Sequence, residues 1–151
     1  MHSDADLSLL AVDLVAAGSH FARAAYQVSE VGLSYVSLRA LAAIEREPGL
    51  RVGELAVREG ITQPSMSQTI KRLVDDGLLE RTPSAEDARA SDLTITEAGR
   101  DAVRRYRADS AERIVPVFKD LSPGDIEALQ RAAEILPGLT KQLRENLGSQ
   151  K

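Results

Sequence analysis

The sequence predicts a mainly α-helical fold with one small β-sheet of two or three strands. Aromatic residues make up only 3% of the 151 residues, whereas Ala, Leu, Val and Arg are abundant, and this composition suits helices packed on helices. Apolar residues recur at helical spacing along most of the chain. After Gly77 the period changes, and two short segments with strand character follow at 78–82 and 92–95. The length fits one domain, or one domain with an appended element.

The totals exclude several classes of protein. Cysteine is absent, so the chain has no disulfide, no thiolate metal site and no cysteine redox sensor. The first thirty residues carry four acids and no basic leader, so we expect no signal peptide. No uninterrupted apolar run reaches about 18 residues, so we expect no membrane span. These observations predict a soluble, cytoplasmic protein.

The first predicted helix covers residues 6–28 and carries a heptad-like apolar stripe. Such a helix needs a partner helix, and that partner can come from its own chain or from a second chain. A core helix and a dimer helix therefore both remain open. The stripe consists of Leu7, Leu10, Leu14, Ala17, Phe21, Ala24 and Val28.

Three further helices follow, joined by tight turns. Ser34 is placed to cap a helix that stops at Pro48-Gly49, and Gly53 takes the N-cap place of a short helix at about 53–59. A glycine-containing turn, residues 59–62, leads to the next helix. This is the layout of a helix-turn-helix.

The stretch between Gly60 and Gly77 predicts the recognition helix of that motif. Thr62 can accept a backbone N–H of the first turn, where Pro64 is tolerated. Met66, Ile70, Leu73 and Val74 fall on one face.

Along the opposite face of this helix, small residues at the N-terminal end are followed by an amide side chain and then by two basic side chains. A helix that enters a DNA major groove needs this order, because an amide reads base edges and cations meet phosphates. An ordinary amphipathic surface helix explains the face alone equally well, and the neighbouring elements favour DNA. With the capping Thr62, the predicted DNA contacts are Pro64, Ser65, Gln68, Lys71 and Arg72.

The net charge of −4 and a pI near 5.2 are a mild argument against nucleic acid. Between Thr62 and Leu73, however, the only charged residues are Lys71 and Arg72, and there is no acid. The main alternative is a winged helix that binds a protein partner and not DNA. The acidic pI supports that alternative, whereas Lys71, Arg72 and Arg89 on one expected face oppose it.

The two predicted strands enclose a polar, turn-forming tip at 83–91. A hairpin directly after a recognition helix is a wing. Arg89 at its tip can enter a minor groove, where a narrow groove concentrates negative potential.

Two long helices complete the chain. Thr96 caps a helix expected at 97–119, which Pro116 should kink or divide. Ser122 and Pro123 begin a last helix that runs to about residue 146, bends at Pro137 and places an apolar stripe inside. We expect residues 34–100 to form a DNA-binding subdomain, and residues 1–33 with 101–151 to form a helical dimerisation subdomain. The expected interior stripe of the last helix is Ile126, Leu129, Ala133, Leu136, Leu139 and Leu143.

In these features the chain resembles the MarR (multiple antibiotic resistance regulator) family of winged helix-turn-helix transcription factors. Each matching piece is weak, but all five occur in order at the right spacing. They are Glu54-Leu55-Ala56, Ser65–Leu73, Gly77-Leu78-Leu79, Asp87-Ala88-Arg89 and Ile95-Thr96-Glu97-Ala98-Gly99.

The chain departs from the family pattern at three positions. Ala88 replaces a common second wing arginine, Gly53 replaces a hydroxyl cap, and Ile95 replaces Leu. The resemblance implies that Asp87 orients Arg89 by an ion pair and does not touch DNA. It also implies an obligate homodimer formed by the first and last helices, ligands bound between that subdomain and the winged helix, and a tendency to repress.

Other chemistry has little support in the sequence. The only histidines are His2 and His20, and His20 has no cysteine or paired acid at ligand spacing, so we expect no metal site. We find no phosphate-binding glycine loop and no nucleophile–base constellation. We therefore expect no cofactor, no catalytic residues and no enzyme activity.

A ligand site is predicted where the first two helices meet. An arginine can pair the carboxylate of a small phenolic or aromatic acid, and a tyrosine can stack or donate a hydrogen bond. The alternative is that the arginines are solvated and the tyrosines fill gaps in a core short of aromatics. The candidates are His20, Arg23 and Tyr26 on the first helix, and Tyr35 and Arg39 on the second.

Overall fold

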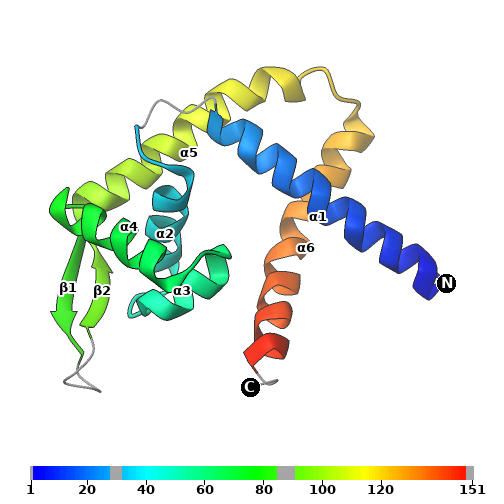
Figure 1. Cartoon of the computed structure of the whole chain (residues 1–151). Coiled ribbons are helices and arrows are strands. Elements are labelled where there is room, and N and C mark those ends of the chain that lie inside the picture. Colours follow the sequence, from blue (N-terminus) through cyan, green and yellow to red (C-terminus); the bar gives the residue numbers. More distant parts are fainter. Residues whose placement is uncertain (1, 28–31, 85–90, 149–151) are drawn as a thin grey trace. The chain divides into compact units, whose positions relative to one another are not determined.

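The computed structural model describes residues 2–27, 32–84 and 91–148, which form six helices and a two-stranded sheet (Figure 1). The predicted fold class is thus confirmed. Two compact units, Met1–Glu112 and Arg113–Lys151, divide the chain within its fifth helix. The elements are α1 (Asp4–Gln27), α2 (Tyr35–Arg46), α3 (Val52–Glu59), α4 (Gln63–Asp75), β1 (Leu79–Pro83), β2 (Ser91–Ile95), α5 (Glu97–Phe118) and α6 (Pro123–Gly148).

Short-range caps set the bounds of α2, α3 and α4, the predicted helix-turn-helix. Ser37 N–H donates to Ser34 Oγ at 3.1 Å and fixes the start of α2. Gly60 ends α3 with a φ of +64°, a left-handed conformation that glycine adopts without steric strain. Ile61 N–H then donates to the Ala56 carbonyl at 3.1 Å, so the chain turns at once toward α4.

The start of α3 differs from the prediction that Gly53 is its N-cap. Gly53 lies inside the first turn, and Arg51 is the N-cap. The Arg51 backbone N–H donates to the Glu54 carboxylate at 2.9 Å. Glu54 reaches back from the third helical position, so the helix begins without a hydroxyl at its cap.

The predicted hairpin forms as β1 paired antiparallel with β2, with Leu79 opposite Ile95. No third strand forms in the described residues, although Gly49 N–H donates to the Leu93 carbonyl at 3.4 Å. The ladder extends to Pro83 and Ser91, which were predicted as part of the tip. Residues 85–90, including Asp87 and Arg89, lie outside the described residues.

Thr96 connects the end of α4 to the start of α5. Its hydroxyl accepts the Gly99 N–H at 3.1 Å, as predicted for a cap, and donates to the Gly77 carbonyl at 2.7 Å. Thr96 N–H donates to the Leu78 carbonyl at 3.1 Å. A Cβ built on Gly99 would lie 2.2 Å from the Leu78 carbonyl oxygen, so only glycine fits this contact.

Every buried apolar side chain in the described part of the chain comes from residues 38–103. Apart from Leu50 in the loop after α2, these side chains come from α2, α3, α4, the hairpin and the first turns of α5, which lie together in Figure 1. This core holds the recognition helix in place. Its largest fully buried members are Leu41, Ile44, Leu55, Met66, Ile70, Leu73, Leu79, Leu93 and Val103.

Helix α1 keeps its apolar stripe exposed, with Leu10 at 61% and Phe21 at 54% exposure. The elements of the first compact unit therefore leave the stripe of α1 uncovered. By length and composition alone Asp4–Tyr26 could cross a membrane, because an 18-residue window has a mean hydropathy of 1.3, and none of that window is buried. The core helix of a soluble protein and a signal sequence pass the same test.

Helix α6 starts as predicted, with Asp125 N–H donating to Ser122 Oγ at 3.2 Å. Its leucines were predicted to lie inside, but Leu129, Leu136, Leu139 and Leu143 are exposed. Local spacing identified the stripe correctly and could not show whether this chain covers it.

Helices α5 and α6 both run through their prolines. Pro116 lies two residues before the end of α5, where a missing N–H removes one hydrogen bond from the last turn. It therefore does not divide α5.

Candidate nucleic-acid interface and adjoining cavity

The recognition helix α4 is anchored on one side and capped at its start. Met66, Ile70 and Leu73 are buried, as their spacing predicted. Ser65 N–H donates to Thr62 Oγ1 at 3.3 Å, and the hydroxyl oxygens of these two residues are 2.9 Å apart. The cap thus orders the first turn of α4, which a groove-binding helix presents to DNA.

The opposite face of α4 is open to solvent. The predicted contacts Thr62, Pro64, Ser65, Gln68, Lys71 and Arg72 are all exposed.

The two cations of this face differ. Lys71 Nζ pairs with the Asp75 carboxylate at 2.9 Å, while Arg72 has no ion-pair partner among the described residues. Both members of the Lys71–Asp75 pair are well exposed, and such pairs contribute little. Arg72 therefore offers the unpaired positive charge of this helix.

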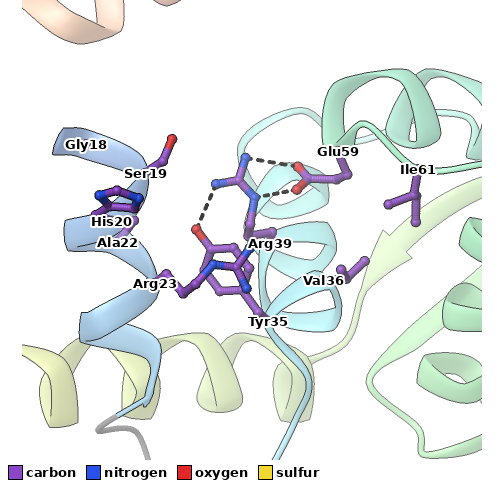
Figure 2. Close-up of a pocket in the computed structure, with 10 residues that line it drawn as sticks. All are labelled: Gly18, Ser19, His20, Ala22, Arg23, Tyr35, Val36, Arg39, Glu59 and Ile61. Atoms are coloured by element: carbon purple, nitrogen blue, oxygen red, sulfur yellow. Dashed lines mark hydrogen bonds and ion pairs between the residues drawn. The ribbon is translucent and has the colours of Figure 1, made fainter. Parts of the chain in front are cut away.

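A cavity of about 700 Å³ lies between α1, α2 and the end of α3, within the first compact unit (Figure 2). Four of the five predicted ligand-binding residues line it, namely His20, Arg23, Tyr35 and Arg39.

Tyr26 does not line the cavity. Its hydroxyl donates to the Leu33 carbonyl at 2.8 Å, and its ring lies 5.2 Å from the ring of Tyr35, between centroids. It supports the neighbouring wall, which fits the interpretation of this tyrosine as a packing residue.

Arg39 forms an ion pair with Glu59, an acid that was not among the predicted cavity residues. Its Nε and Nη2 donate to the two carboxylate oxygens of Glu59, and its Nη1 lies 3.3 Å from the hydroxyl of Tyr35 (Figure 2). Hydrogen bonding to Glu59 raises the pKa of Arg39 although burial acts in the opposite direction. The Glu59 side chain is only 7% exposed, so this carboxylate depends on its partner.

One signal in the sequence could have identified Glu59. It is the last residue of α3, where the negative end of the helix dipole disfavours an acid. An acid in that place needs a cation nearby.

Arg23 is the second arginine of the cavity and differs from Arg39. Its guanidinium carbon lies 5.8 Å from the centroid of the Tyr35 ring, within cation–π range. It is exposed and has no ion-pair partner in the part of the chain that the structure describes. His20 also faces the cavity, and the described residues contain no cluster of three His, Cys, Asp or Glu side chains that could hold a metal.

Comparison with known proteins identifies the family. The model of the MarR family matches residues 31–90. An uncharacterized HTH-type transcriptional regulator of Mycobacterium bovis is 30% identical over 114 residues, which cover 76% of this chain and 78% of the relative. The chain belongs to the MarR family. Members of the MarR family are DNA-binding transcriptional regulators and generally not enzymes, so DNA binding by the winged helix-turn-helix follows from membership.

Other MarR-like proteins agree in sequence or fold. The HTH-type transcriptional regulator PetP of Rhodobacter capsulatus is 30% identical over 98 residues, 65% of this chain and 59% of PetP. MarR of Escherichia coli, in its apo form, has the same fold with a TM-score of 0.71 at 16% identity, over 84% of this chain and 96% of that one. The MarR family protein Rv2887 of Mycobacterium tuberculosis, in complex with salicylic acid, gives a TM-score of 0.63 at 26% identity, over 90% and 99% of the two chains.

Proposed function

We propose that this MarR-family regulator is a cytoplasmic repressor that binds a palindromic operator as a homodimer and is released by a small aromatic acid. The observation that carries the proposal is the two-sided recognition helix. Its apolar face is fixed in the core, and every predicted DNA contact on its other face is exposed. A dimer placed over a promoter blocks polymerase, which is why repression is the favoured direction.

The exposed helices support the homodimer. The stripes of α1 and α6 present large apolar side chains that need cover. In this proposal residues 1–33 and 101–151 form the dimerisation subdomain, and residues 34–100 bind DNA. Two recognition helices then meet half-sites about one helical turn apart.

The DNA contacts divide by chemistry. Ser65 and Gln68 read base edges, while Lys71 and Arg72 contact phosphates. Arg89, oriented by Asp87, enters the minor groove from the wing, and both residues stay predictions.

The cavity supports the ligand. It combines an unpaired arginine with apolar surface, which suits a small phenolic or aromatic acid. The salicylic acid complex of Rv2887 adds support from a relative. To release DNA, the acid has to bind more tightly to the form of the dimer that does not fit the operator.

The direct test is to map the operator protected on the genome of the source organism, with and without salicylate. A palindromic footprint that salicylate weakens is expected. A protected site without twofold symmetry would contradict the dimer arrangement, and a footprint unaffected by aromatic acids would contradict the ligand.

A salt titration with matched variants tests the contacts. Arg72→Ala should lower the salt slope by about one unit on cognate and random DNA alike. Gln68→Ala should instead lose about 1–3 kcal/mol of discrimination at one base pair. A flat salt response in the parent protein would favour the alternative of a protein-binding module.

A further inference from the structure

Three charged side chains line the cavity, and they are not equally available to bind an anionic ligand. Arg39 uses three of its nitrogens on Glu59 and Tyr35, so its charge is largely neutralised where it stands. Arg23 is the cation left free to bind an incoming anion. Counting Arg23, Arg39 and Glu59, the lining carries a net charge of one positive unit, since 2 − 1 = 1.

The position of Glu59 makes this arrangement stable. Its carboxylate is nearly buried and both its oxygens face Arg39, so separating the pair would strand a buried charge. A carboxylate from a ligand therefore meets less resistance at Arg23 than at Arg39. The apolar lining residues Ala22, Val36 and Ile61 offer surface to an aromatic ring.

We propose that Glu59 determines ligand specificity, by compensating the positive charge of Arg39 so that the cavity accepts an aromatic monocarboxylate on Arg23 and disfavours a dicarboxylate. This inference rests on the proposed ligand control and refines it. A second carboxylate would find no free cation and would lie near the charge of Glu59. Removing the Glu59 charge frees Arg39 and should widen the specificity to dianions.

The test compares two probes of similar shape, benzoate with one charge and phthalate with two, titrated calorimetrically into the full-length protein at pH 8. The parent protein should bind benzoate more tightly. Glu59→Gln should shift the ratio of affinities toward phthalate by about fivefold, the size of a well-formed, partly exposed ion pair. Arg23→Gln should weaken benzoate by about tenfold, the effect of losing one hydrogen-bonded charge.

Two variants separate charge from packing. Glu59→Gln combined with Arg39→Gln returns the net charge to one positive unit, so the preference for benzoate should return. Glu47→Gln is the matched control, because Glu47 also pairs with an arginine, Arg58 at 2.8 Å, but does not line the cavity. It should leave the ratio unchanged.

Several results would overturn the proposal. They are an unchanged ratio in Glu59→Gln, an equal shift in Glu47→Gln, a double variant that keeps the shift toward phthalate, or a parent protein that prefers phthalate. If Glu59→Gln does not fold, the double variant decides, because it strands no charge and should bind benzoate within about twofold of the parent. Benzoate binding without the expected shift refutes only the role of Glu59, whereas no binding of either acid refutes the ligand control as well.

Discussion

The winged-helix segment buries its large apolar residues, whereas the terminal helices leave theirs exposed. Elements within residues 38–103 fully bury Leu41, Leu55 and Ile70. By contrast, Leu10 and Leu143 are more than 60% exposed. Both regions have regular helical spacing of apolar residues. The comparison shows that spacing predicts a helix and its apolar face, while cover depends on which other elements are available. The first region completes its core from its own sequence, and in the proposed homodimer a second chain covers the terminal helices.

The largest effect should come from charges placed in the exposed stripe. Leu10→Glu combined with Leu14→Glu should raise the dimer dissociation constant by about a thousandfold or more, because each buried carboxylate costs several kcal/mol. The winged helix should stay folded, since it contains neither residue. Light scattering and circular dichroism measure the two properties.

Ser8→Glu is the control, since Ser8 lies away from the stripe on α1. It should remain dimeric. A double glutamate variant that stays dimeric at micromolar concentration would remove α1 from the interface and break the comparison.

A core truncation should have the next largest effect. Leu41→Ala should lower the free energy of unfolding by about 2–5 kcal/mol, the range for a buried leucine. The loss should persist in the Leu10→Glu, Leu14→Glu background if the core is independent of the dimer. Urea unfolding measures it, and exposed Val57→Ala should change stability by less than about 0.5 kcal/mol.

Glycine substitutions extend the comparison to the backbone. Gly99→Ala should destabilise the protein by about 2 kcal/mol, because its Cβ would overlap the Leu78 carbonyl. Gly18→Ala in α1 adds a carbon that, beyond its own helical turn, meets no atom of the described residues within 4 Å, so it should stabilise the helix by about 0.5–1 kcal/mol. Thermal melting of both variants tests this, and a tolerated alanine at position 99 would contradict the close contact.

The smallest effect concerns pH and the start of α1. Hydrogen bonds from the side chain and backbone of Ser3 lower the pKa of Asp6 from its ordinary value of 3.8. A carboxylate with a lowered folded-state pKa stabilises the helix above pH 3.8, and this contribution is lost as the pH falls through the lower value. As the pH falls through that range, amide exchange in the first turn of α1 should become faster before the core unfolds. In Asp6→Asn this pH dependence of the exchange should disappear.

The parts of the fold that depend on neighbours a few residues apart could be predicted. The caps at Ser34, Thr62, Thr96 and Ser122 all form, because each hydroxyl meets a backbone N–H three residues along the chain. The error at Gly53 is also local, since a glutamate that reaches back can replace the expected cap.

The candidate site was only partly predictable for a different reason. Four cavity residues were found because they interrupt helical faces, but Arg39 and Glu59 are twenty residues apart. The place of Glu59 at the end of α3 indicates that it needs a cation, but no spacing rule joins residues on separate helices, so only the structure shows that this cation is Arg39. The outer face of α4 could be predicted because its other face packs against the core at regular spacing.

The bonds around Thr96 have a mechanical consequence. Two hydrogen bonds from Thr96, to the carbonyls of Gly77 and Leu78, and the Gly99–Leu78 contact tie the end of α4 to the first turn of α5, and each would be disrupted if the two helices rotated against one another. The junction between α4 and α5 is therefore rigid and does not act as a hinge. If a bound acid alters the spacing of two recognition helices, the winged segments have to travel as rigid bodies, with the compliance located elsewhere in the chain.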